Sequence, residues 1–137
     1  MLIGPEMAKA LTIDGRELGD LPIELLRERI ADVRPVDRSE VWLNDSAGPA
    51  LCILKSGTRA LLMYLRCEGD VGLTSRSRGD HDDGDLEFTL ANGQVDLCPS
   101  EWTVAFEDAA RAAEHFWLEA KPAPFVSWHD DSDPPSE

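Results

Sequence analysis

Two neighbouring stretches of the chain, residues 50–55 and 60–65, are apolar at almost every position. A β-strand points successive side chains to opposite faces of its sheet, so a strand without regular polar positions is covered on at least part of each face. The two stretches therefore predict strands at the centre of a sheet. Ser56 and Gly57 between them have the composition of a tight turn.

An amphipathic strand is predicted just before this pair. In residues 40–44, Val41 and Leu43 share one face and Trp42 lies on the other. Residues 45–49 predict the connecting turn, because Asp, Ser, Gly and Pro favour tight changes of direction. We therefore expect these strands to follow one another as an antiparallel meander.

Further strands are predicted at residues 71–75 and 86–90. The second of these alternates apolar and polar residues, and Asn92-Gly93 behind it is the strongest hairpin signal of the chain. Val95 and Leu97 return on the other side of that turn. The polar stretch between the two strands is too long for a tight turn, which indicates a functional or disordered loop.

Two helices complete the predicted elements. The first begins at Asp20, which can cap it, and ends before Pro35. The second covers residues 103–118, and the prolines that follow end it. The apolar stripe of the first helix consists of Ile23, Leu26, Ile30 and Val33. The apolar face of the second consists of Phe106, Ala109, Ala110, Ala113, Phe116 and Trp117.

Together these elements predict an α+β fold, in which an antiparallel meander sheet of about five to seven strands carries an N-terminal and a C-terminal helix. Residues 1–128 are expected to form one domain, because a chain of 137 residues supports a single core. Residues 124–128 predict a short extended segment. Residues 129–137 are acidic and contain prolines, so we expect them to be a flexible tail.

The chain has a net charge of −14, from 27 acidic and 13 basic residues. Such a surface repels nucleic acid and anionic lipid and attracts basic proteins. No apolar run is long enough for a membrane span, and the first residues lack the positive charge and apolar segment of a signal peptide. We therefore expect a cytoplasmic protein that binds neither nucleic acid nor membranes.

No sequence motif for catalysis, for a metal or for a cofactor was found. The stretch from Asp80 to Asp85 resembles a calcium loop, but its glycine and its twelfth residue do not fit the EF-hand pattern. Cys52, Cys67 and Cys98 form neither a CxxC pair nor a disulfide framework. The sequence therefore predicts a protein that is not an enzyme and uses no metal or cofactor.

Charge is concentrated between Arg66 and Glu87, where seven acidic residues accompany three arginines. A loop between two strands stands on a rigid base, so these side chains are candidates for binding a basic cleft. The alternative is a loop that is only solvated. The candidate contact residues are Glu68, Asp70, Arg76, Arg78, Asp80, His81, Asp82, Asp83 and Asp85.

The C-terminal half contains a hairpin sequence from Phe88 to Asp96, an alanine-rich helix that ends near Phe116, then Lys121-Pro122 and Trp128. This order resembles immunity protein family one of bacterial polymorphic toxin systems, over roughly residues 41–128. The resemblance implies an α+β fold and a cognate inhibitor of a secreted toxin, often a nucleic-acid deaminase. It supplies no catalytic residues, and Phe116, Pro122 and Trp128 match the family pattern as core and closing residues.

The predicted partner is therefore a basic toxin domain, bound one to one by a protein that is a monomer when free. A deaminase toxin binds nucleic acid through a basic surface around zinc, and an acidic inhibitor can occupy that surface. Two other functions remain open. One is a small acidic secretion chaperone or adaptor, which would dimerise, and the other is a small hydrolase that uses His81 with neighbouring carboxylates.

Overall fold

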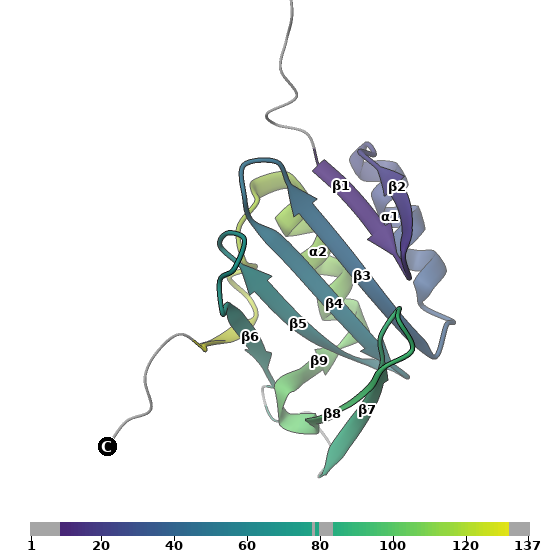
Figure 1. Cartoon of the computed structure of the whole chain (residues 1–137), viewed down its shortest axis with the longest axis vertical. Coiled ribbons are helices and arrows are strands. Elements are labelled where there is room, and N and C mark those ends of the chain that lie inside the picture. Colours follow the sequence, from purple (N-terminus) through teal and green to yellow (C-terminus); the bar gives the residue numbers. More distant parts are fainter. Residues whose placement is uncertain (1–8, 78, 80–83, 132–137) are drawn as a thin grey trace, which may run out of the picture.

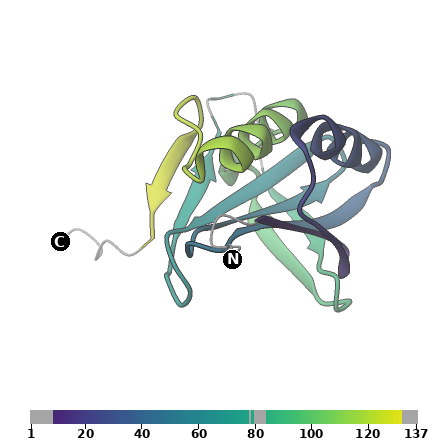
Figure 2. The same ribbon diagram turned by 90° about the horizontal axis from the view of Figure 1, so that it is seen from above.

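The computed structural model describes residues 9–77, 79 and 84–131. In this part of the chain an antiparallel sheet carries two helices on one face and a hairpin on the other, as Figure 1 and Figure 2 show. The strands of the sheet are β1 (Lys9–Ile13), β2 (Arg16–Gly19), β3 (Arg38–Asp45), β4 (Ala50–Ser56), β5 (Arg59–Leu65), β6 (Leu73–Arg76), β9 (Thr103–Ala105) and β10 (Ser127–Asp130). The hairpin consists of β7 (Asp85–Thr89) and β8 (Val95–Pro99), the helices are α1 (Ile23–Val33) and α2 (Phe106–Glu119), and the 3-10 turn η1 (Ser100–Trp102) precedes β9.

The strand order of the sheet is β10-β6-β5-β4-β3-β1-β2, and β9 pairs with β5 off this path. The predicted α+β fold and its central meander are thus confirmed, since β3, β4, β5 and β6 are successive in the chain and adjacent in the sheet. One edge of β5 pairs with β9 along Arg59–Leu61 and with β6 at Met63 and Tyr64. Two separate segments of the chain therefore cover the same strand edge.

The central strands are covered on both faces, as their apolar sequences predicted. β4 is buried along its whole length. On the helical face Ile53 of β4 pairs with Val41 and Leu62 of its neighbours, and on the opposite face Cys52 pairs with Trp42. β4 therefore contributes side chains to two separate hydrophobic cores, one on each face of the sheet.

The hairpin of β1 and β2, which widens the sheet beyond β3, was not predicted from the sequence. Asp14 and Gly15 join its strands with φ values of 50° and 84°. These positive values match a type I′ turn, for which Asp-Gly is a favoured pair. That dipeptide was the available signal, but both flanking stretches are short, and residues 16–19 contain a single large apolar side chain, Leu18.

The predicted stripe of α1 is buried at Leu26, Ile30 and Val33, and Ile23 is partly buried against the same core. Its start differs from the prediction, because Pro22 occupies the N-cap position without a side-chain cap. Asp20 instead accepts a hydrogen bond from the backbone N–H of Lys9 at 3.2 Å. The expected cap residue therefore links the two ends of the β1–β2 hairpin.

α2 begins at Phe106, three residues later than predicted, because residues 103–105 form β9. Thr103 and Val104 are β-branched, which favours a strand where an open edge of β5 is available. The buried face is as predicted except that Ala112, rather than Ala110, is fully buried. The helix ends at Glu119, and Ala120 caps its last turn with a left-handed φ of 58°.

The larger core lies between the helices and the sheet. The rings of Tyr64 and Phe116 meet edge to face with centroids 6.1 Å apart. The indole N–H of Trp117 donates to the carbonyl of Leu21 at 2.8 Å, which joins α2 to the segment before α1. Each large apolar side chain buried here contributes about 1.5–3 kcal/mol.

One charged side chain, Lys55 of β4, is buried in the same region with only 2% of its surface exposed. Its Nζ donates to the carbonyl oxygens of Val36 and Gly57, the second at 2.6 Å. Burial lowers the pKa of the Lys55 ammonium, and the nearby Asp37 opposes that shift. The lysine therefore joins the segment after α1 to the β4–β5 turn.

The chain closes the sheet with β10, which pairs with β6. Trp128 packs against the larger core, and its indole N–H donates to the carbonyl of Ala123 at 2.9 Å. The prediction that the tail begins at residue 129 was wrong, because His129 and Asp130 belong to β10. Residues 132–137 lie outside the described residues.

Candidate binding surface

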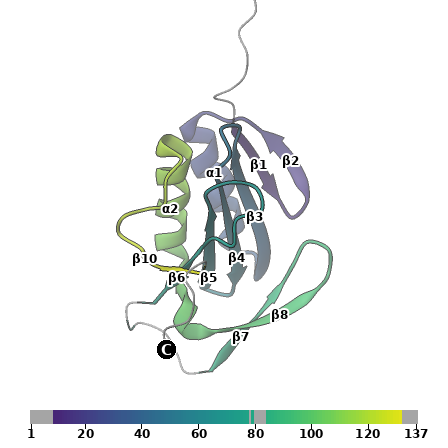
Figure 3. The same cartoon turned by 60° about the vertical axis from the view of Figure 1, so that its left-hand side comes forward.

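The described residues cover the face of the sheet opposite the helices only in part. The β7–β8 hairpin crosses it at the end where β4 meets β5, and Figure 3 shows the hairpin projecting beyond the sheet. A smaller core of Cys52, Leu54, Leu61 and Phe88 fixes the hairpin to the sheet, and Phe88 is fully buried. The projecting hairpin therefore has a packed base.

The outer side of this hairpin carries exposed apolar side chains beside the carboxylates of Asp85 and Glu87. Val95 and Leu97 are 52% and 65% exposed, and they lie opposite Thr89 and Glu87 in the strand register. Arg38 of β3 braces this side by donating to Glu87 at 3.1 Å and to Thr89 at 3.3 Å. Exposed apolar side chains with a charged rim are typical of protein contact surfaces. Asp85 lies on the same side of the hairpin as Glu87, whereas Asp96 pairs with the buried Phe88 and lies on the side that faces the sheet.

A groove of about 380 Å³ opens at the opposite end of the same sheet face. It lies between the β3–β4 turn and the connection from β5 to β6. Trp42, Ala50 and Leu65 supply its apolar side chains, and Glu68 is the one charged residue among the described residues that line it. The other lining residues are Asn44, Gly48, Cys67 and Gly69.

Trp42 connects the hairpin with the groove, because it packs against the smaller core and also lines the groove. Its indole N–H donates to the carboxylate of Glu40 at 2.6 Å. Glu40 also accepts a hydrogen bond from the backbone N–H of Ala91, in the hairpin turn, at 2.7 Å. A half-buried indole ring is thus held in a defined orientation between the two features.

The predicted contact residues are divided by β6 and do not form one acidic surface within the described part of the chain. Glu68 and Asp70 belong to the connection from β5 to β6. Asp85 begins β7 beyond the other end of β6, where the N–H of Ser77 donates to the carbonyl of Glu101 at 2.7 Å. The predicted residues Arg78, Asp80, His81, Asp82 and Asp83 lie outside the described residues.

Asp70 binds Arg66 within its own loop, the connection from β5 to β6. Its carboxylate accepts hydrogen bonds from the guanidinium of Arg66 at 2.8 and 3.0 Å and from the backbone N–H of Arg66 at 2.9 Å. These bonds hold the pKa of the Asp70 carboxyl well below its usual range. Arg66 also lies 3.4 Å from Asp130 of β10. The charge of Asp70 is therefore compensated within the chain, and its contact role stays a prediction.

Arg76 packs against the protein instead of projecting from it. Its guanidinium carbon lies 4.6 Å from the centre of the Trp102 ring. The same group donates to the hydroxyl of Thr74 at 3.1 Å and to the carbonyl of Ser75 at 2.7 Å. Burial lowers the pKa of the Arg76 guanidinium. Its main observed contacts join β6 to η1.

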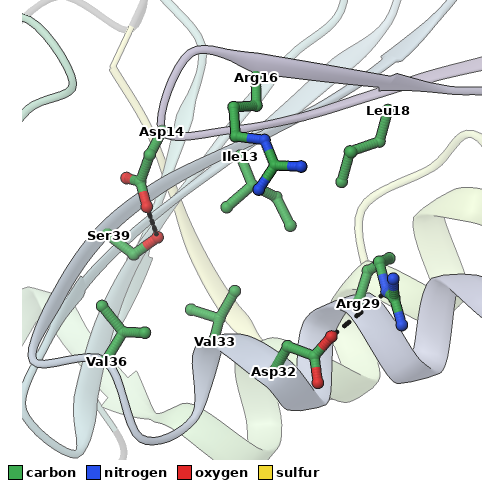
Figure 4. Close-up of a pocket in the computed structure, with 9 residues that line it drawn as sticks. All are labelled: Ile13, Asp14, Arg16, Leu18, Arg29, Asp32, Val33, Val36 and Ser39. Carbon is green, nitrogen blue, oxygen red and sulfur yellow. Dashed lines mark hydrogen bonds and ion pairs between the residues drawn. The ribbon is translucent and has the colours of Figure 1, made fainter.

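A second cleft, of about 250 Å³, lies between the β1–β2 hairpin and α1 (Figure 4). Asp14 accepts a hydrogen bond from the hydroxyl of Ser39 at 2.9 Å, and Asp32 lies 3.3 Å from Nε of Arg29. Arg16 extends over the cleft. With two arginines and two aspartates this cleft lacks the acidic excess of the chain. Its apolar lining residues are Ile13, Leu18, Val33 and Val36.

Within residues 9–77, 79 and 84–131, no group of His, Cys, Asp and Glu could hold a metal ion. None of the helices in that part is both long and apolar enough to pass through a membrane. Burial raises the pKa of the Cys52 thiol, and burial with Asp96 and Asp85 raises the pKa of Cys98. Both thiols are therefore protonated at neutral pH, which makes them poor nucleophiles.

Trp42, Val95 and Leu97 were predicted to lie in strands, but their place on this surface was not predicted. Alternation alone shows which side chains share a face, and it does not show which face remains uncovered. No protein-family model matches the chain, and no curated protein matches it. The resemblance to immunity protein family one therefore stays a prediction. Any proposed function depends on the geometry of the surface.

Proposed function

We propose that the protein is an immunity protein, a cytoplasmic binding domain that neutralises a basic secreted toxin by covering its active surface and catalyses no reaction. The β7–β8 hairpin is the observation that supports this most directly, because Val95 and Leu97 are exposed beside Asp85 and Glu87 on a packed base. The net charge of −14 provides long-range attraction to a basic partner.

Charge and apolar area have separate roles in such an interface. The acidic excess speeds the encounter and is screened by salt. Apolar side chains at the centre of an interface supply most of the affinity. A stable interface buries about 1,600 Å² in total, so the contact should extend from the hairpin across Trp42 to the groove on the same face.

A nucleic-acid deaminase is the toxin class that we favour for this partner. Its substrate is a polyanion, so its zinc site lies within a basic surface. An acidic protein can compete for that surface without resembling a nucleotide. Added salt should therefore weaken both the complex of the toxin with this protein and the binding of nucleic acid by the toxin.

The proposed function predicts a toxin domain, encoded by a neighbouring gene, that forms a one-to-one complex with this protein. We expect a Val95→Ser, Leu97→Ser double variant to weaken that complex about tenfold or more in calorimetry. Leu118→Ser is the matched control, because Leu118 is 61% exposed on α2, away from the hairpin face. If the double variant binds and protects cells as well as the control does, the hairpin is not the contact surface.

A small acidic secretion chaperone or adaptor is the alternative, and it predicts a dimer. Light scattering of the free protein distinguishes the two, since the immunity function predicts a monomer. A stable dimer that binds a secreted protein without inhibiting it would favour the alternative.

A further inference from the structure

We propose that the groove between the β3–β4 turn and the connection from β5 to β6 receives an arginine side chain of the basic partner. This inference rests on the proposed function and names the chemistry that one part of the surface recognises. The aliphatic stem of the arginine would lie against Leu65, with its guanidinium plane on Trp42 and its charge at Glu68.

The lining of the groove matches the two parts of an arginine side chain. Trp42 and Leu65 provide apolar contact for the methylene groups. An indole ring is also the strongest of the aromatic partners for a cation. Arginine fits better than lysine, because a planar guanidinium stacks on a ring while it pairs with a carboxylate.

The charge of the groove is also available to a partner. Glu68 is exposed, and no ion pair within the described residues engages it. Asp70, two residues further along, differs because Arg66 already compensates the negative charge of its carboxylate. In the cleft beside α1 two arginines balance the two aspartates that line it, so that cleft offers a cation no net negative charge.

Both walls of the groove are held in place before any partner binds. In the β3–β4 turn, buried Asp45 accepts a hydrogen bond from the backbone N–H of Ala47 at 2.8 Å. In the other wall, Arg66 and Asp70 bind each other through the hydrogen bonds described for this loop. A preformed groove costs less conformational entropy on binding than a mobile one.

A small probe tests the groove without any toxin. We would titrate N-acetyl-arginine amide into the isotope-labelled full chain and follow the indole N–H of Trp42 by NMR. N-acetyl-citrulline amide is the matched control, because it has nearly the same shape without the charge. We expect saturable shifts at Trp42 and Cys67 with the arginine amide and several-fold weaker binding of the citrulline amide. Equal binding of the two probes, or no saturable shift, would overturn the inference.

Substitutions separate the contributions of charge and ring. Glu68→Gln should weaken binding of the arginine amide roughly two- to fivefold, while Glu17→Gln on β2 should leave it unchanged. Trp42→Leu should weaken it by a similar factor. Trp42 also packs against the smaller core, so Trp42→Phe provides a variant that keeps an aromatic ring and should retain most of the binding. Wild-type affinity in both Glu68→Gln and Trp42→Leu would contradict the proposed site.

The outcome is independent of whether the immunity function is correct. A groove that selects arginine amide over citrulline amide supports the site even if no toxin is found. A protein that neutralises its toxin but has a groove that ignores the arginine amide would refute this inference and leave the proposed function in place.

Discussion

The ammonium nitrogen of Lys55 lies 5.4 Å from the centre of the Phe106 ring, at the first residue of α2. The backbone N–H of Phe106 also donates to the carbonyl of Thr58 in the β4–β5 turn, at 2.9 Å. The buried cation is tolerated because two carbonyl oxygens and the face of the ring replace its water. The ring and the backbone N–H of Phe106 therefore both attach the start of α2 to the end of β4 and the β4–β5 turn.

Replacing Lys55 by methionine should destabilise the fold. The substitution nearly preserves volume but leaves the carbonyls of Val36 and Gly57 without their donor, so we expect a loss of about 2–4 kcal/mol in the free energy of unfolding by urea. Lys121→Met, at an exposed lysine after α2, is the control and should change stability by less than about 0.5 kcal/mol. Similar stabilities of the two variants would show that the buried hydrogen bonds contribute little.

Gly72→Ala should be more destabilising than Gly69→Ala. Both glycines have positive φ, 92° and 84°, so each alanine carries a backbone cost of about 1 kcal/mol. Only at Gly72 would the added Cβ come within 2.8 Å of the carbonyl oxygen of Tyr64, while nothing lies within 4 Å at Gly69. Overpacking adds about 1–3 kcal/mol. Thermal unfolding of the two variants measures the difference, and equal melting temperatures would contradict it.

Asp70→Asn should reduce stability at neutral pH and have less effect in acid. Hydrogen bonds from Arg66 lower the pKa of the folded carboxyl. A lowered folded pKa stabilises above the unfolded value of about 3.9, and that contribution is lost as the pH falls below it toward the folded pKa. The melting temperatures of wild type and variant should therefore converge below about pH 4. A difference that stayed constant with pH would assign the effect to packing instead.

The three cysteines should react at different rates with a thiol reagent at neutral pH. Cys67 is exposed, Cys98 is half-buried and Cys52 is buried. Burial and the neighbouring carboxylates raise the pKa of Cys98, and burial raises that of Cys52, so both have little thiolate. We expect one fast equivalent per chain, which Cys67→Ser removes, and full labelling only after unfolding. Fast labelling of Cys52 in the folded protein would show that the smaller core opens.

Much of the fold was predictable from local patterns. The apolar stretches of β4 and β5 and the Asn92-Gly93 turn predicted the central strands and the second hairpin. The strand β9 was not predictable in the same way, because Thr103 and Val104 pair with an edge of β5 that exists only in the folded sheet. The buried role of Lys55 was missed for the same reason, since its carbonyl partners come from two separate turns.

The candidate site was less predictable than the fold. Sequence proximity grouped Glu68, Asp70 and Asp85, but β6 separates the first two from the third. The charge of Asp70 is compensated by Arg66, which net charge along a segment does not reveal. The exposed pair Val95 and Leu97 depends on which side of the hairpin faces the sheet, and that follows from the packing of Phe88.

Trp42 belongs both to the smaller core and to the wall of the groove. Its replacement would therefore affect folding and recognition together, whereas the rim residues Asn44 and Glu68 can change without disturbing the core. If relatives of this protein neutralise different toxins, they should diverge at the rim and at the outer positions of the hairpin. Binding specificity could then evolve one surface residue at a time, while Trp42 stays unchanged.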